Sequence, residues 1–190
     1  MTRILLLVLV AASACSSDGH APPDGGPPPE LQILYRSRDG MSVAGEALAQ
    51  VPLTLPPQGG MVLLVGMRTN LASKDPVTLT ASIRDAVDDQ LLSVEQRPVQ
   101  LKLGSDGWSS PDEPSSMVNW ANLPACPIAT ATRDLYDQPY VLRIAVEDEA
   151  GAMAEAKLSI VPTCEPGPDG DLCRCLCDHR YVLGEPCPSS

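Results

Sequence analysis

The stretch YVLRIAVEDEAGAMAEAKLSI, residues 140–160, carries the clearest structural pattern in this chain. Apolar side chains alternate there with polar ones such as Arg143 and Glu155, on both sides of a polar turn. Successive side chains of a strand point to opposite faces, so this period of two predicts two strands with one buried face each. Gly151 can adopt the positive φ of a tight turn, and Asp148 can accept hydrogen bonds from the turn backbone. The stretch therefore predicts an antiparallel hairpin.

The same alternation recurs along the preceding hundred or so residues. Further strands are predicted at residues 31–35, 51–55, 61–65, 77–84, 99–103 and, less regularly, 117–123. The segment 77–84 is the most regular, with Val77, Leu79, Ala81 and Ile83 predicted to face the core. Short helical turns are also compatible with residues 45–50 and 129–136. About eight strands separated by turn residues are typical of an antiparallel sandwich or barrel.

The hairpin sequence also resembles a known pattern. A strand that begins with Tyr140, followed by Asp148 eight residues later and Gly151 three beyond, is similar to the closing hairpin of bacterial immunoglobulin-like and PKD-like domains. The resemblance implies that residues 31–163 form an all-β, immunoglobulin-like antiparallel β-sandwich. The alternative is a generic β-hairpin, because such turns recur in many folds.

The start of the chain has the layout of an export signal. Arg3 provides a positive charge, residues 4–12 are apolar, and the small residues Ser13 and Ala14 precede Cys15. This order predicts a signal peptide over residues 1–14. The apolar run is far shorter than the ~20 residues of a membrane-spanning helix. We therefore predict no transmembrane helix in the mature protein.

The four residues Ala12-Ser13-Ala14-Cys15 resemble the lipobox of bacterial lipoproteins, although Ala12 stands where that family usually has Leu. The resemblance implies that Cys15 is lipidated, becomes the first residue after cleavage and holds the protein on a membrane through acyl chains such as palmitate. Ser16, in place of Asp, favours the outer membrane over the inner one by the same resemblance. The alternative is an ordinary secretory signal with an incidental cysteine.

Residues 15–30 contain the lipidated cysteine and a segment rich in Pro and Gly without apolar periodicity. Such a composition predicts a disordered tether rather than a packed element. An extended, polyproline-like tether of this length would reach about 45 Å. His20 lies in this tether and is predicted to be a linker residue.

Six cysteines remain after Cys15, and an even number in an exported chain predicts three disulfides. Cys173, Cys175 and Cys177 are separated by single residues, and a bridge across one residue is strained. The spacing therefore favours pairing each of them with a different partner from the set Cys126, Cys164 and Cys187. A direct Cys126–Cys164 bridge is the main competing scheme.

The Cys-rich tail, residues 164–190, also allows a second interpretation. Cys173, Cys175, Cys177 and His179 together could bind a soft ion such as Cu(I) or Zn. The run lacks the CxxC spacing of structural zinc sites, and exported thiols tend to oxidise. Disulfides are therefore the prediction, metal binding is the alternative, and His179 is predicted to lie at the surface.

Acidic residues on the predicted sandwich suggest one more possible site. Asp85, Asp88 and Asp89 follow one strand, and Asp134 and Asp137 precede its expected neighbour. Carboxylates that meet at one pole can bind Ca²⁺ when several oxygens converge, but no regular calcium-loop motif is present. The acidic run at residues 147–149 is expected at the opposite pole.

Charge and motif content narrow the function. The formal charge of −11 disfavours nucleic acid, whose phosphates require clustered Lys and Arg. The only two histidines lie in the tether and the tail, so no Ser-His-Asp or Cys-His arrangement can be placed on the domain. Acidic residues are plentiful, but nothing singles out a pair for glycoside chemistry. We predict a non-catalytic lipoprotein of the bacterial cell envelope, without a cofactor, that serves as a binding or spacer module for a protein or glycan partner.

Overall fold

The computed structural model describes residues 28–37, 40–43, 47–71, 76–111 and 117–187. These residues form eleven strands, a short 3-10 helix and one α-helix, which makes the fold mostly β. The strands are β1 (Leu31–Ser37), β2 (Gly40–Val43), β3 (Ala49–Thr54), β4 (Met61–Thr69), β5 (Val77–Asp85), β6 (Leu91–Val99), β7 (Leu101–Leu103), β8 (Ser109–Pro111), β9 (Ala121–Cys126), β10 (Tyr140–Glu147) and β11 (Met153–Thr163). The 3-10 helix is η1 (Met117–Asn119), and the α-helix is α1 (Pro168–Cys177).

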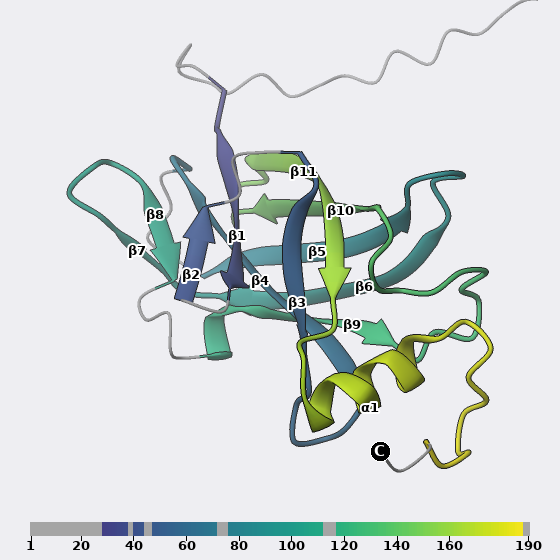
Figure 1. Cartoon of the computed structure of the whole chain (residues 1–190). Helices are drawn as coiled ribbons and strands as arrows, with labels where there is room; N and C mark the ends of the chain where they lie inside the picture. Colours follow the sequence, from purple (N-terminus) through teal and green to yellow (C-terminus); the bar gives the residue numbers. More distant parts are fainter. Residues whose placement is uncertain (1–27, 38–39, 44–46, 72–75, 112–116, 188–190) are drawn as a thin grey trace, which may run out of the picture.

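The strands make one curled mixed sheet in the order β2-β1-β4-β3-β11-β10-β5-β6 (Figure 1). β8 and β9 pair with β4, and β7 pairs with β8. β3 connects two parts of the sheet, because it begins parallel to β11 and ends antiparallel to β4. β6 packs close to β9, and the Ser93 hydroxyl at this contact donates to the Pro124 carbonyl at 2.5 Å. The sheet therefore folds back on itself around a single core.

The core is built almost entirely from aliphatic side chains. Val77, Leu79, Ala81 and Ile83 of β5 are at most 1 % exposed, which confirms the predicted inward face of this strand. The β4 residues from Met61 to Met67 are buried on both faces, as the continuous apolar run of its first half predicted. The chain contains no Phe, and Tyr140 is the largest fully buried side chain among the described residues.

The hairpin of β10 and β11 is confirmed in register and in turn chemistry. Glu147 lies opposite Met153, and the ladder extends to the pair of Tyr140 and Ile160. Asp148 accepts hydrogen bonds from the backbone N–H groups of Ala150 and Ala152 at 2.9 and 2.8 Å. Gly151 has a φ of 82°, which a residue with a side chain adopts only with strain. The turn therefore depends on both residues that the sequence singled out.

The two ends of β4 face different parts of the chain. At its last residue, the Thr69 hydroxyl donates to the Glu30 carbonyl at 2.6 Å, just before β1 begins. At its first residue, Met61 borders the same hollow as Cys173 of α1. In Figure 1, β1 begins at the top of the view and α1 lies at the bottom. The segment that leads in from residues 28–30 and the helix thus cap opposite ends of the sheet.

Several elements differ from the sequence prediction. The predicted strand at 99–103 is shortened to β7 because Val99 is the last residue of β6, and the predicted strand at 117–123 begins with η1 and continues as β9. Residues 129–136 form turns and bends rather than a helical turn, and residues 49–50 belong to β3. β2, β6 and β8 were not predicted; in β6, residues 91–98 are all partly or fully exposed, so the strand lacks a buried alternating face. The predicted signal peptide, Cys15 and residues 16–27 of the tether lie outside the described residues.

Candidate functional site: the disulfide-linked pole

The C-terminal tail contains an α-helix that the sequence did not predict. In a helix, residues four apart lie on one face, so Cys173 and Cys177 of α1 both point toward the sheet, where they are 1 % and 3 % exposed. Cys175 lies between them on a different face. The C-x-C-x-C spacing therefore directs two sulfurs inward and one outward.

All six cysteines of the described chain are joined in three disulfides. Cys126 pairs with Cys177, Cys164 with Cys173, and Cys175 with Cys187. This arrangement gives each cysteine of the C-x-C-x-C run a different partner, as the spacing favoured, and the competing Cys126–Cys164 bridge is wrong. Disulfides also occupy Cys173, Cys175 and Cys177, so the structure has no free thiol there for the metal alternative built on these residues and His179. We call residues 164–187 together with Cys126 the disulfide-linked pole.

The loop at residues 127–139 joins this pole to the sheet. Arg133 binds Asp85 in a bidentate manner, with Nε–Oδ2 and Nη2–Oδ1 distances of 2.7 and 2.9 Å. The Arg133 guanidinium also lies 4.4 Å from the centre of the Tyr140 ring. Hydrogen bonds from Arg133 lower the pKa of Asp85 against the opposing effect of burial. Burial raises the pKa of Tyr140 to about 12. Asp85 is thus ionised and Tyr140 neutral at physiological pH.

The next residues of this loop contact the tail directly. The Asp134 carboxylate accepts a hydrogen bond from the His179 backbone N–H at 3.1 Å, and its Oδ1 lies 2.7 Å from the His179 Nδ1. The Leu135 backbone N–H donates to the Cys177 carbonyl at 3.0 Å. His179 is partly exposed, as predicted, but it orders the tail against the loop rather than standing alone in solvent.

Asp134, Asp178 and His179 have ligand atoms within 4.8 Å of one another. Asp178 is held by Arg180 through contacts of 3.0 and 2.7 Å, and these hydrogen bonds lower the pKa of Asp178 to about 2. A cation at this position would have to displace the Arg180 guanidinium. The cluster is therefore explained as an ion-pair network that orders the start of the segment after α1.

Among the described residues, no three of the acidic residues considered for calcium bring their carboxylate oxygens within 4.8 Å of one another. Asp85 and Tyr140 are opposite each other in the β5–β10 ladder, and Glu147 pairs at the other end of β5, so the predicted poles are confirmed. Asp85 binds Arg133, and Asp89 is bound by Arg84 and Arg143. Asp88 instead accepts from the backbone N–H of Gln90. Because Ca²⁺ needs several converging oxygens, the pairing with arginines removes the basis for that site.

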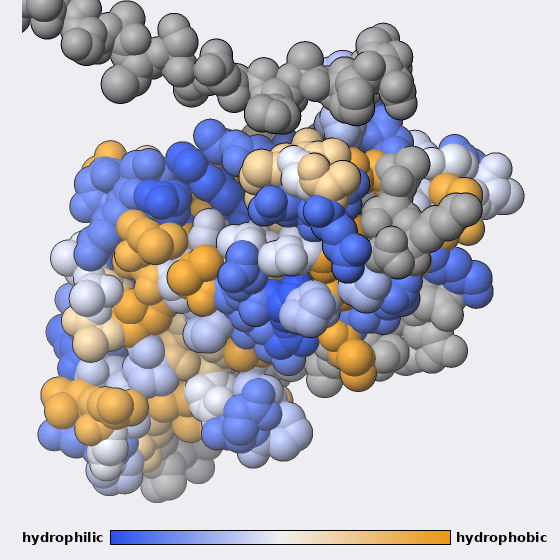
Figure 2. All heavy atoms as spheres, turned by 180° about the vertical axis from the view of Figure 1, so that it is seen from behind, coloured by the Kyte–Doolittle hydropathy of each residue, from blue (hydrophilic) through white to orange (hydrophobic). Residues whose placement is uncertain are grey.

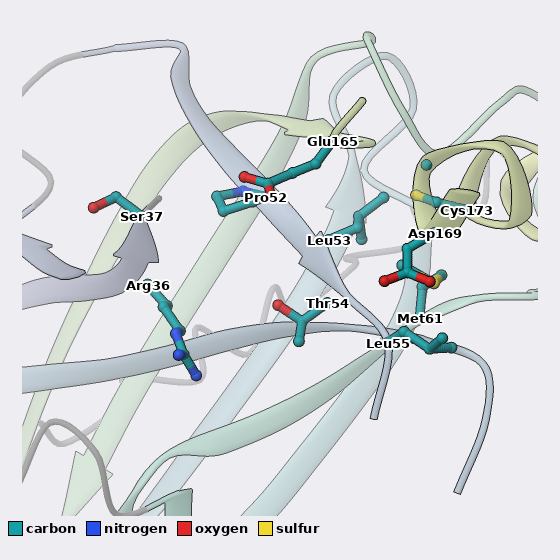
Figure 3. Close-up of a pocket in the computed structure, with 11 residues that line it drawn as sticks. Arg36, Ser37, Pro52, Leu53, Thr54, Leu55, Met61, Glu165, Asp169 and Cys173 are labelled. Carbon is teal, nitrogen blue, oxygen red and sulfur yellow. The ribbon is translucent and has the colours of Figure 1, made fainter. Parts of the chain in front are cut away.

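A groove of about 340 Å³ lies between β3 and α1 (Figure 3). Its floor is apolar and consists of Leu53, Met61 and Cys173, which are 5 %, 2 % and 1 % exposed. Figure 3 shows Arg36 and Asp169 on opposite sides of the hollow. A second hollow of about 350 Å³ shares Ser37, Pro52 and Glu165 with the first, so the groove continues beside the parallel pair β3 and β11.

Close packing of backbone fixes one wall of this groove. A Cβ atom on Gly170 would lie 1.6 Å from the Glu165 carbonyl oxygen, so only glycine allows this approach of α1 to the preceding turn. The Cys164–Cys173 disulfide joins the same two segments. The wall is thus set by one glycine and one covalent bond. An apolar floor with one cation and two carboxylates on the rim suits an extended segment that carries an apolar side chain between polar groups.

The sequence did not predict the groove, and its residues were assigned only to separate strands or to the tail. Leu53 was assigned to a strand, and Asp169 to the disulfide-bearing Cys-rich tail, for which no helix was predicted. No sequence signal brings residues of β1, β3 and α1 together, because the parallel contact of β3 with β11 and the disulfides decide that arrangement.

The face of the molecule that lies behind the view of Figure 1 has a mixed surface. Figure 2 shows apolar side chains in several areas separated by hydrophilic ones. Exposed apolar side chains of the whole described chain include Val87, Leu103, Val118 and Leu183, which lie in different segments.

Comparison with known proteins finds no matching family model, no matching curated protein and no matching solved structure.

Proposed function

We propose that this chain is an exported bacterial lipoprotein that is anchored to the cell envelope through Cys15. Its β-domain acts as a non-catalytic binding or spacer module and presents the groove of the disulfide-linked pole to a protein or glycan partner. The observation that carries the proposal is the placement of residues 28–30 and α1 at opposite ends of β4. An anchor at the N-terminus then leaves the groove on the far side of the domain.

Distances support this orientation. β4 has nine residues, and at ~3.3 Å per residue its ends are about 26 Å apart. The tether expected from the sequence adds about 45 Å when extended. A partner that is too large to approach the membrane closely can still reach the groove. None of the helices in the described part of the chain has the length and apolar character to cross a membrane.

We further propose that the domain is an immunoglobulin-like sandwich. The Tyr140 hydroxyl donates to the Asp134 carbonyl six residues upstream, at 2.8 Å, which is the geometry of the tyrosine corner of that fold. The strand groups β1-β4-β9 and β3-β11-β10-β5-β6 correspond to its two layers, and β3 shared between them supports the same assignment. The conserved inter-sheet disulfide of antibody domains has no counterpart among the disulfides of the described chain, which all reach the tail.

The non-catalytic part of the proposal is supported by charge pairing. Around the disulfide-linked pole, the Asp85 and Asp178 carboxylates are ion-paired with Arg133 and Arg180, respectively. Carboxylates held in this way stabilise structure and are poor proton donors at neutral pH.

The anchor is tested by expressing the full chain in bacteria supplied with radiolabelled palmitate. The wild-type chain should incorporate label and lose its leader, whereas Cys15→Ala should remain unlabelled. Ser16→Ala is the matched control and should be labelled normally. A wild-type chain that is cleaved but carries no label would show an ordinary secretory signal and contradict the anchor.

The groove is tested separately by photo-crosslinking in intact cells. A photoreactive residue at Thr54, on the groove, should give one reproducible adduct with an envelope component. The same residue at Val94, which is 53 % exposed on β6 and does not line the groove, should not. If neither position gives an adduct, the binding role of the groove is rejected and only the spacer role of the domain remains.

A further inference from the structure

A separate hollow, which shares no lining residue with the groove of the disulfide-linked pole, lies at the hairpin of β7 and β8. It has a volume of about 420 Å³. It is lined by Leu34 of β1, by Arg68 of β4 and by the hairpin tip, which includes Trp108. Ser105 and Ser110 contribute the serine hydroxyls of the hollow.

The hairpin tip is built to hold Trp108 in place. Gly104 donates to the Trp108 carbonyl at 2.7 Å, and the Asp106 carboxylate accepts from the Trp108 backbone N–H at 3.1 Å. A Cβ atom on Gly104 would lie 2.8 Å from the Asp106 Oδ1 and 3.2 Å from the Trp108 carbonyl oxygen, so a side chain here would crowd the turn. Gly107 has a φ of 80°, which again favours glycine. The indole is therefore positioned by a local, tightly bonded turn.

Arg68 completes the hollow from the sheet. Its guanidinium lies 4.7 Å from the centre of the Trp108 ring, and its Nη2 donates to the Asp106 Oδ2 at 2.8 Å. The Arg68 Nε is buried and has no hydrogen-bond partner among the described residues. The Trp108 backbone N–H and the Arg68 charge lower the pKa of Asp106, so this carboxylate is ionised and balances the guanidinium. The pair offers planar donor and acceptor groups without net charge.

We propose that this hollow binds a neutral sugar ring. One face of a hexose presents C–H groups that pack on an aromatic ring, and its hydroxyls need both donors and acceptors close together. Trp108 supplies the apolar wall, Asp106 the acceptors, and Arg68 with Ser105 and Ser110 the donors. The volume accommodates a small ligand of one or two rings. The balanced charges of Arg68 and Asp106 favour a neutral sugar over an anion or a cation.

The site does not rest on the lipid anchor or on the groove of the disulfide-linked pole. It places a sugar contact on the β4 half that leads to Thr69, near the segment that enters the domain. A tethered envelope protein with such a site could contact a glycan on its anchor side and another partner at its far pole.

The chain offers a direct reporter for this proposal, because Trp108 and Trp120 are its only tryptophans. Trp120 is 3 % exposed and lies against Gly66, whereas Trp108 is partly exposed in the hollow. We would titrate the full, disulfide-oxidised, ¹⁵N-labelled chain with chitotriose, cellotriose and maltotriose and follow the two indole N–H signals. At least one of these sugars should shift the Trp108 signal saturably, with a Kd between about 0.1 and 10 mM, and leave the Trp120 signal unmoved.

Variants separate binding from folding. Ser105→Ala removes one exposed hydroxyl from the hollow and should weaken the sugar about fivefold, the equivalent of one hydrogen bond. Leu103→Ala, in the same hairpin and 70 % exposed, does not line the hollow and should bind like the wild type. Equal affinity of Ser105→Ala and wild type, shifts of both indoles together, or no saturable shift with any of the three sugars would overturn the proposal.

Discussion

The sheet and the disulfide-linked pole are stabilised in different ways. The sheet buries a continuous aliphatic cluster, with Leu63, Leu79 and Leu142 fully inaccessible. The helix α1 contributes mainly cysteines to the same cluster, and its other side is exposed. A ten-residue helix with Pro and Gly in its first turns is marginal by itself. The sheet is thus held by burial, and the pole by covalent bonds to the sheet.

The loop at residues 127–139 is where these two kinds of stabilisation meet. Arg133 faces the sheet through Asp85 and Tyr140, while Asp134 and Leu135 hold the tail. Arg133 therefore binds the sheet, whereas the next two residues of the loop, Asp134 and Leu135, bind the C-terminal tail. Changes in the sheet, the loop and the tail should differ in how far they lower the stability of the whole domain.

The largest effect is expected from the disulfide that ties the pole to the sheet. Cys126 and Cys177 close a span of 51 residues, whereas Cys175 and Cys187 close one of 12. By loop entropy, replacing the first pair with alanines should lower the free energy of unfolding by about 4 kcal/mol, and replacing the second by about 3 kcal/mol. Chemical unfolding measures both values, and amide exchange should show α1 losing protection only with the first pair. Equal protection in the two variants would mean that α1 is held without the Cys126 bond.

The next effect concerns the ion pair between loop and sheet. Asp85→Asn should cost about 2 kcal/mol at pH 7, because it weakens a bidentate pair with a nearly buried carboxylate. The pKa of Asp85 is lowered in the folded state, so its contribution is full above the unfolded pKa of about 3.9 and is lost as the pH falls below that value. Urea unfolding at pH 7 and pH 3 should show the difference between variant and wild type shrinking in acid.

Asp89→Asn provides the matched control for that ion pair. Asp89 also binds arginines, but its side chain is 60 % exposed, so the change should cost less than about 0.5 kcal/mol. Similar losses for the Asp85 and Asp89 variants would show that burial does not distinguish the two pairs.

A smaller effect is expected when one tyrosine hydroxyl is removed. Tyr140→Phe deletes a hydrogen bond of a fully buried side chain to the Asp134 carbonyl and should cost about 1.5 kcal/mol. Tyr181→Phe deletes an equivalent bond to the Glu185 carbonyl in the exposed tail and should change the free energy of unfolding very little. Thermal unfolding of the two variants compares sheet with tail by the same chemical change. A neutral Tyr140→Phe would argue against the tyrosine corner.

The smallest effect is expected at the turn glycines. Gly151 and Gly184 both have positive φ, and both have open space where a Cβ would lie, so alanine introduces only backbone strain. Gly151→Ala should cost about 1 kcal/mol because the hairpin turn unfolds with the sheet. Gly184→Ala should be almost neutral, since the tail beyond α1 can relax without disturbing the core. Equal losses in chemical unfolding would show that the tail unfolds together with the sheet.

Local sequence patterns were sufficient for the long strands that bury one face regularly. The alternation at residues 77–84 and 140–160 predicted β5, β10, β11 and their turn, because burial repeats every two residues in a strand. β6 was not predicted because most of its side chains are partly or fully exposed. It is the last strand in the order of the sheet and packs close to β9. A pattern of burial cannot mark a strand that lacks a buried face.

The cysteines show the same division. The sequence alone determined that six cysteines form three bridges, and that neighbours in the C-x-C-x-C run avoid one another, because both follow from compartment and covalent geometry. Only the tertiary structure decided which partner each one takes. Helical geometry turns Cys173 and Cys177 toward the sheet and Cys175 away from it. The groove of β3 and α1 and the hollow at Trp108 were likewise decided by tertiary structure, because each combines residues that are distant in the chain and become neighbours only when the sheet folds back on itself.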